Sequence, residues 1–132
     1  MSTPELSVVN RMFEAFDAKD LEAAVATVSD DTVWTHHGSQ KLPSLHFKGK
    51  SGVRKFFETN FNTMHAEYFR VLKTIQSGNT VIAFGEEEFL IDGRDGHFAQ
   101  KWVQVYTVLN GLITRMEEFA TSAEEPQYIV VE

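Results

Sequence analysis

The feature that most constrains the fold of this chain is a change of hydrophobic period near its midpoint. In the first half, apolar side chains recur at helical spacing, which predicts helices over 4–16, after Asp20, and over 51–61. In the second half the pattern becomes strand-like in four runs separated by turns rich in Gly and Asn, namely 66–76, 80–91, 97–109 and 112–121. The order predicts an α+β fold in which three N-terminal helices pack on a curved, mostly antiparallel sheet.

Local signals set the ends of the predicted elements. Thr3 can cap the first helix and Pro4 suits its first position, while Asp20 can cap a second, alanine-rich helix that carries Val28 inward. The β-branched and aromatic run 32–37 predicts a short strand, and a polar loop around Pro43 follows it. We therefore expect the element order ααβαββββ.

Composition excludes several classes of protein. The 132 residues are 42% hydrophobic, which suits one domain with a core over about 5–121 and an acidic tail over 122–132. The absence of cysteine excludes disulfides and thiolate catalysis, and a net charge of −7 disfavours nucleic acid and anionic membranes as partners. Residues 1–10 lack the features of a signal peptide and no apolar run is long enough to span a membrane, so we expect a cytoplasmic location.

Short patches along the chain resemble a known family. They occur in a fixed order: 10–16 with 19–23, then Asp30-Asp31-Thr32-Val33-Trp34, then Phe47-Lys48-Gly49-Lys50, and finally 103–108 before Asn110-Gly111-Leu112-Ile113. Over about 5–121 the chain resembles the nuclear transport factor 2-like (cystatin-like) superfamily, and within it the SnoaL-like and ketosteroid isomerase-like group. The resemblance implies a cone-shaped fold with an internal pocket and a homodimer formed through the sheet face. It does not imply one activity, because this fold hosts isomerases, cyclases, dehydratases, hydrolases and non-enzymes.

The isomerase members of this family use a carboxylate base with a Tyr and a neutral Asp that stabilise the oxyanion. The resemblance carries the base to Thr35, the Tyr to Met12 and the Asp to Gln104. Threonine cannot act as a base at neutral pH and methionine donates no hydrogen bond, although glutamine can donate one. We therefore expect the cavity to carry chemistry other than steroid isomerisation.

The same positions predict which side chains face the cavity, because side chains alternate along a strand. They place Thr35 with His37, and Gln104 with Trp102 and Tyr106, on the inner face. Corresponding reasoning places Glu118 inward on the last strand, and Phe84 and Glu86 inward on the second of the four long strands. The predicted ligand-binding residues are Thr35, Gln104, Trp102, Tyr106, Phe84, Met12 and Phe16. Such a mostly apolar lining predicts a pocket for a small, largely hydrophobic molecule.

Three residues are candidates for acid–base catalysis: Glu118, Glu86 and His37. A carboxylate desolvated among aromatic rings has its pKa raised toward neutrality, as a general acid or base requires. Each candidate also has a structural interpretation, as a cross-strand ion pair, a solvated strand end or an exposed loop histidine respectively. The sequence thus leaves open a cofactor-independent enzyme of isomerase, cyclase, dehydratase or hydrolase type, a ligand carrier, and a protein-interaction module.

Metal and nucleotide cofactors are not indicated. None of the five histidines is spaced His-x-His or His-x-x-x-His, and adjacent His36 and His37 point to opposite faces of a strand. Lys48-Gly49-Lys50-Ser51 lacks the rest of a phosphate-binding loop. On the outer sheet face we expect Trp34, Val103 and Val105, an apolar set that predicts burial against a second copy, or alternatively under the tail segment 128–131.

Overall fold

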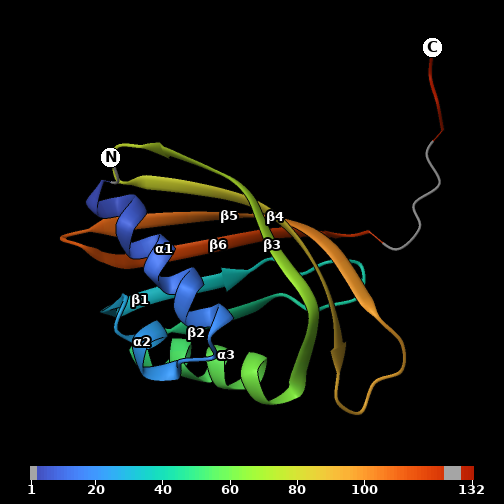
Figure 1. Cartoon of the computed structure of the whole chain (residues 1–132), viewed down its shortest axis with the longest axis horizontal. Coiled ribbons are helices and arrows are strands. Elements are labelled where there is room, and N and C mark those ends of the chain that lie inside the picture. Colours follow the sequence, from blue (N-terminus) through green and yellow to red (C-terminus); the bar gives the residue numbers. More distant parts are fainter. Residues whose placement is uncertain (1–2, 124–128) are drawn as a thin grey trace.

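The computed structural model describes residues 3–123 and 129–132, and three helices with one six-stranded sheet make up its regular structure (Figure 1). In chain order the elements are α1 (Pro4–Asp17), α2 (Leu21–Val25), β1 (Val28–His36), β2 (Leu45–Lys48), α3 (Gly49–Thr63), β3 (Met64–Ser77), β4 (Thr80–Ile91), β5 (Phe98–Leu109) and β6 (Leu112–Ser122). The strands lie in the order β2-β1-β6-β5-β4-β3. The expected α+β architecture is confirmed.

All neighbouring strands are antiparallel except β1 and β6, the second and third strands of the sheet, which run parallel. This pair places His36 opposite Glu118, although β1 begins the sheet and β6 ends it in sequence. Its register is irregular between Val28 and Val33, so the two strands do not alternate in step over their whole length. The parallel pair brings polar residues from both ends of the chain together.

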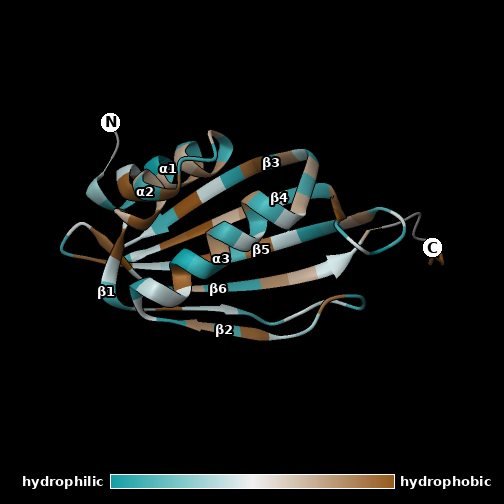
Figure 2. Ribbon diagram, turned by 90° about the horizontal axis from the view of Figure 1, so that it is seen from below, coloured by the Kyte–Doolittle hydropathy of each residue, from teal (hydrophilic) through white to brown (hydrophobic). Residues whose placement is uncertain are grey.

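The helices lie on one face of the curved sheet, which bends around them (Figures 1 and 2). Between the layers Phe13 of α1 packs against three rings, with centroid distances of 6.1 Å to Phe69, 6.3 Å to Trp102 and 5.9 Å to Tyr106. Phe57 of α3 is fully buried in the same core. Aromatic rings therefore fill the space between helices and sheet and leave room at one end of it.

Gly85 of β4 permits the closest approach within this core. A Cβ atom at Gly85 would lie 2.0 Å from Cζ2 of Trp102 and 2.5 Å from the carbonyl oxygen of Arg70. The indole of Trp102, which is 2% exposed, therefore lies against the backbone of β4. Only glycine leaves space for the ring at this position.

Most of the predicted elements are present, with two differences. The α1 and α3 helices and the four long strands agree with the periods in the sequence, but α2 ends at Val25 and Val28 already belongs to β1. The predicted polar loop around Pro43 is followed by strand β2, which the sequence pattern does not predict. This strand has four residues and three of them are exposed, so it shows no apolar alternation by which to recognise it.

Among the residues that the structure describes, no helix is long and apolar enough to cross a membrane. The cytoplasmic location expected from the sequence stays a prediction.

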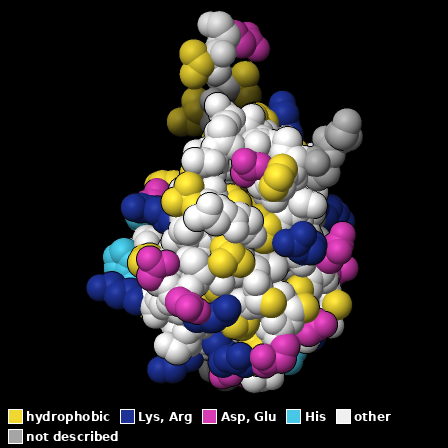
Figure 3. Space-filling view, turned by 90° about the vertical axis from the view of Figure 1, so that its left-hand side faces the viewer, with side chains coloured by type: hydrophobic (Ala, Val, Ile, Leu, Met, Phe, Trp, Pro, Cys, Tyr) yellow, Lys and Arg dark blue, Asp and Glu magenta, His cyan; other side chains and the backbone are white. Residues whose placement is uncertain are grey.

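Seen from the left-hand side of Figure 1, acidic and basic side chains are interspersed on the surface (Figure 3). Of the tail, Ser122 still belongs to β6, residues 124–128 lie outside the described part, and Ile129, Val130 and Val131 are exposed and in no strand.

Candidate functional site

A cavity of about 270 Å³ lies between the helices and the inner face of the sheet. Its walls are mainly apolar and aromatic, and they include Met12, Phe13 and Phe16 from α1, Phe56 and Phe57 from α3, and Trp34 from β1. Polar groups come from the strands beneath, namely His36, Glu87, Gln100, Gln104, Tyr106 and Glu118. Apolar walls with a few placed polar groups are typical of sites for small organic molecules.

A polar contact of the cavity joins His36 to Glu118, where Nε2 lies 2.5 Å from Oε2. The parallel pairing of β1 and β6 places these residues opposite each other. After β1 the chain turns at Gly38, whose positive φ of 85° lets its N–H donate to Nδ1 of His36 at 2.9 Å. Because Nδ1 accepts this hydrogen bond, the proton of the ring lies on Nε2, which donates to Oε2 of Glu118.

The second oxygen of Glu118 is also bonded. Nε2 of Gln104 donates to Oε1 of Glu118, and the hydroxyl of Tyr106 donates to Oε1 of the same glutamine. The amide orientation of Gln104 is thereby fixed, since its nitrogen must face the carboxylate and its oxygen must face the phenol. Burial and the charge of Glu118 raise the pKa of Tyr106 well above its ordinary value, so this phenol remains a donor. The four side chains form one chain of hydrogen bonds centred on Glu118.

Glu87 of β4 supplies a second carboxyl group to the cavity. Burial, followed by the charge of Glu118, raises its pKa to about 8, although a hydrogen bond donated by Gln100 acts in the opposite direction. Glu87 is therefore mostly protonated at neutral pH and has an O–H to donate. Burial lowers the pKa of His36, but the hydrogen bond to Glu118 and its charge outweigh burial, so that this pKa lies above its ordinary value.

The structure places most of the predicted inner residues of α1, β5 and β6 at the cavity. Met12, Phe16, Gln104, Tyr106 and Glu118 all line it. Trp102 is buried on the same face as predicted, but it stacks on Phe13 and Phe69 behind the cavity wall. The face assigned to β5 and β6 from the sequence is thus correct.

The face assigned to β1 is wrong by one residue. Trp34 and His36 point into the cavity, whereas the hydroxyl of Thr35 lies 2.9 Å from Nδ1 of His46 in the neighbouring strand β2. The ring of His37 stacks on Phe119 with 4.5 Å between centroids, away from the cavity. The prediction took the face of β1 from the family position carried to Thr35, and an offset of one residue exchanges all side chains between the two faces.

The face assigned to β4 is also wrong. Phe84 is 36% exposed on the outer face, and Glu86 pairs there with Arg70 at 3.1 Å. The inner residues are the odd-numbered ones, including buried Val81 and Ala83. Because β4 carries apolar side chains on both faces, its composition could not distinguish them.

The polar residues of the cavity that were not predicted include three on the strands: His36, Glu87 and Gln100. A signal for His36 was present, since Thr32, Trp34 and His36 alternate and Trp34 is the largest apolar residue of β1. For Glu87 the corresponding signal was its central place in the run 86–88. In a strand, the middle residue of three points to the opposite face from the two outer ones. Gln100 could have been predicted from Gln104, because residues four apart on a regular strand lie on the same face.

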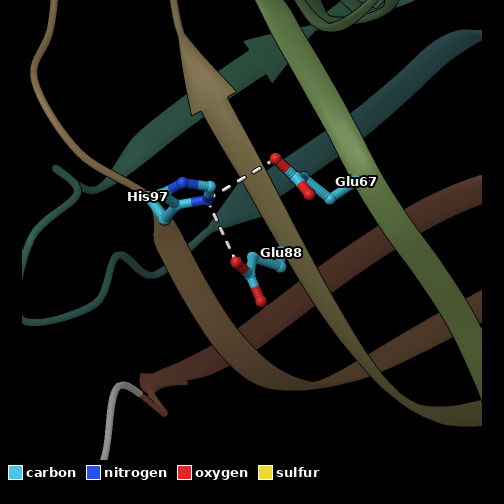
Figure 4. A group of neighbouring side chains, drawn as sticks. All are labelled: Glu67, Glu88 and His97. Carbon is cyan, nitrogen blue, oxygen red and sulfur yellow. Dashed lines mark ion pairs between the residues drawn. The ribbon is translucent and has the colours of Figure 1, made fainter.

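One other group of titratable side chains could hold a metal ion, as far as the described residues show (Figure 4). Nδ1 of His97 lies 3.0 Å from Oε1 of Glu88 and 3.6 Å from Oε1 of Glu67. Glu67 and His97 are exposed and the group does not line the cavity. An imidazole between two carboxylates is already paired, so we assign this group as a surface ion-pair cluster.

Comparison with known proteins identifies the class to which this fold and cavity belong. The profile of the SnoaL-like domain matches residues 9–116, so the chain belongs to the SnoaL-like family. Its structure is similar to an NTF2-like protein from Burkholderia xenovorans LB400 (TM-score 0.79, 20% identity, covering 91% of this chain and 92% of that one). It is also similar to an LEH-like epoxide hydrolase from M. tuberculosis (TM-score 0.70, 15% identity, covering 92% and 84%) and to TerC co-crystallised with polyporic acid (TM-score 0.69, 22% identity, covering 89% and 91%). No curated protein matches the sequence. These similarities establish the nuclear transport factor 2-like fold that the sequence patches predicted.

Proposed function

We propose that this protein binds a small, largely apolar organic molecule in the cavity and catalyses proton transfer on it without a cofactor. The observation that carries the proposal is the presence of two carboxyl groups with different hydrogen-bond partners in one apolar cavity. The carboxylate oxygens of Glu118 accept hydrogen bonds from His36 and Gln104. Glu87 is held neutral by burial, with a pKa of about 8. A base and an acid are therefore available together near pH 7.

The two groups suit proton abstraction next to a carbonyl. In this step Glu118 takes a proton from the carbon beside the carbonyl, and the electron pair of the broken C–H bond moves toward the carbonyl oxygen. The O–H of Glu87 donates a hydrogen bond to that oxygen and stabilises the negative charge. If protonated Glu118 delivers the proton to a different carbon of a conjugated enolate, the step completes an isomerisation. If its proton is first replaced by one from solvent and then returned to the same carbon, the step completes an exchange with solvent. The buried pair with His36 positions the carboxylate throughout.

A second candidate function is binding without catalysis. It is favoured by the hydrogen bonds within the polar network, because Gln104 is fully oriented and both oxygens of Glu118 already have protein partners. TerC, a solved protein of similar structure, was co-crystallised with a small organic molecule, polyporic acid. The two functions differ in whether a bound carbonyl compound exchanges its protons.

The test uses 2-tetralone, an apolar ketone with acidic C–H bonds, as the probe in deuterated buffer. NMR should show binding to the cavity and faster exchange of the α-protons for deuterium than in buffer. In the Glu118→Gln variant this enzymatic rate should fall about 10²- to 10⁴-fold, whereas Glu117→Gln on the outer face should leave it unchanged. Binding without any acceleration by the wild type would contradict catalysis and support the carrier.

We also propose that the protein forms a homodimer through the outer face of the sheet. Phe84, Val103 and Phe119 lie side by side across β4, β5 and β6 and make an apolar row there. The pairs Arg70–Glu86 and Arg115–Glu117 flank the row with charged side chains. An apolar centre with a polar rim is the usual composition of a protein interface.

A further inference from the structure

The open end of the cavity differs in charge from its interior. Besides Glu87, Glu118 and His36, the charged residues of the lining include one other, Arg94. Arg94 belongs to the exposed turn between β4 and β5, and the lining residues Leu42 and Pro43 belong to the loop between β1 and β2. These two loops lie at the same end of the molecule, to the right in Figure 1. A positive side chain is thus placed at the rim of a cavity whose inner acids are negative or neutral.

Arg94 is held in place without neutralising its charge. Its guanidinium lies over the ring of Phe98, 4.9 Å from the centroid. Three of the other arginines, Arg54, Arg70 and Arg115, are paired with carboxylates, but Arg94 has no such partner among the residues that the structure describes. The neighbouring Asp92 is bonded to Nε2 of His65 at 2.8 Å. Arg94 therefore has its donors available to a group at the rim.

The distribution of charge favours one orientation for an anionic ligand. An acidic group at the inner end would face the ionised Glu118, whereas at the rim it would meet a guanidinium. The carboxylate of a ligand therefore points outward and its apolar part points toward Trp34 and the rings of α1 and α3.

The strand geometry gives the length that such a ligand needs. Three residues of β5 lie on the same face of this strand: Phe98, Gln100 and Gln104. Phe98 lies under Arg94, Gln100 is bonded to Glu87, and Gln104 is bonded to Glu118. At about 3.4 Å per residue, Gln100 is roughly 7 Å from Phe98, and Gln104 is roughly 20 Å from it. A group bound at Arg94 thus sits one short spacer away from Glu87, and the rest of the ligand extends toward Glu118.

We infer that the cavity takes apolar monocarboxylates, with the carboxylate bound by Arg94 at the rim and the apolar body inside. This inference rests on the proposed binding of small apolar molecules and adds the class of ligand and a residue that selects it. The shape of the lining admits an aryl or alkyl body, and the guanidinium offers two parallel donors that match a carboxylate.

The test compares 4-phenylbutanoate with 4-phenylbutanamide, which share one body and differ in the charge of the head. Isothermal titration of the wild type should give a dissociation constant about five to ten times lower for the carboxylate. The preference should weaken as salt is raised, because the site is near solvent. Arg94→Gln should abolish the preference while leaving affinity for the amide unchanged, and Arg94→Lys should retain part of it.

Arg11→Gln is the matched control, because Arg11 also has no ion pair among the described residues and lies outside the lining of the main cavity. This variant should keep the full preference for the carboxylate. Equal binding of both probes to the wild type, or a preference that survives Arg94→Gln, would overturn the inference while the cavity's function as a binding site stands. Failure of both probes to bind would count against the ligand class and against the proposed binding function together.

Discussion

His36 and Glu118 face each other across the parallel strands β1 and β6, with Nε2 and Oε2 2.5 Å apart. The carboxylate is the reason that the pKa of His36 lies above its ordinary value although the ring is buried. Gly38 opposes double protonation of the ring, because its N–H needs an unprotonated Nδ1. A measured pKa of His36 therefore tests whether the carboxylate of Glu118 is paired with the ring.

Replacing Glu118 by Gln should change the titration of His36. Without the carboxylate, burial lowers the pKa of His36 and only the charge of Glu87 opposes it, so this pKa should fall from its raised value. Glu118 accepts one hydrogen bond from His36 and one from Gln104. The amide of Gln would turn an N–H toward one of these two donors, which should cost about 1–3 kcal/mol of stability. NMR titration of the imidazole and chemical denaturation measure the two effects. Glu117→Gln serves as the control, and an unchanged titration of His36 in Glu118→Gln would refute the pairing.

Glu87 should make the protein less stable as pH rises. Its pKa is about 8 in the folded state against an ordinary value of 4.5, so the folded state binds more protons between these limits. The contribution is fully present below pH 4.5 and is lost as pH rises through 8, with a slope of up to about 1.4 kcal/mol per pH unit.

Glu87→Gln should remove this slope, which denaturation at a series of pH values will reveal as a flatter profile. Glu86→Gln is a close control, since Glu86 lies next in the chain but on the outer face with Arg70. A profile that is equally steep in Glu87→Gln and in the wild type would show that Glu87 is ionised at neutral pH.

Gly85→Ala should destabilise the protein by about 1–3 kcal/mol, because the new methyl group overlaps the indole of Trp102 and the carbonyl of Arg70. Combining it with Trp102→Phe removes the part of the ring that the methyl meets. Thermal denaturation of both single variants and the double variant gives the coupling between the positions. We expect Gly85→Ala to cost less in the Trp102→Phe background, and simple additivity would contradict the contact.

The proposed dimer predicts twice the mass of one chain in light scattering. Val103→Lys places a charge in the middle of the apolar row on the outer face and should yield a folded monomer. Leu109→Lys, at the exposed end of β5 beside its turn, should leave the mass unchanged. A wild type that scatters as one chain at micromolar concentrations would rule out this assembly.

The sequence predicted the fold well because period and turn chemistry act locally. Helices capped by Thr3 and Asp20, and hairpins at sites such as Asn110-Gly111, depend on residues within a few positions of one another. The order of these elements then left few arrangements for the sheet. The short edge strand β2 was missed because most of its residues face solvent.

The candidate site was predicted in part, because the inner face was assigned correctly for some strands and wrongly for others. On β5 and β6, inner residues such as Gln104 and Glu118 were identified because β5 alternates regularly and β6 does so from Met116 onward. On β1 the predicted face was taken from the family position carried to Thr35, which lies next to the inward-facing His36. On β4 apolar side chains on both faces hid which neighbour points inward. His36 and Glu87 were consequently replaced in the prediction by His37 and Glu86, one residue away in each case.

The parallel pairing of β1 with β6 has a consequence for how the protein folds. The hairpins formed by β3, β4, β5 and β6 join segments close in sequence, whereas His36 meets Glu118 only after a long stretch of chain has been closed into a loop. Contacts between distant segments form slowly, so the hairpins should be established before β1 docks beside β6. The polar centre of the cavity is then among the last parts to assemble, and a nascent chain cannot acquire it until its final strand has left the ribosome.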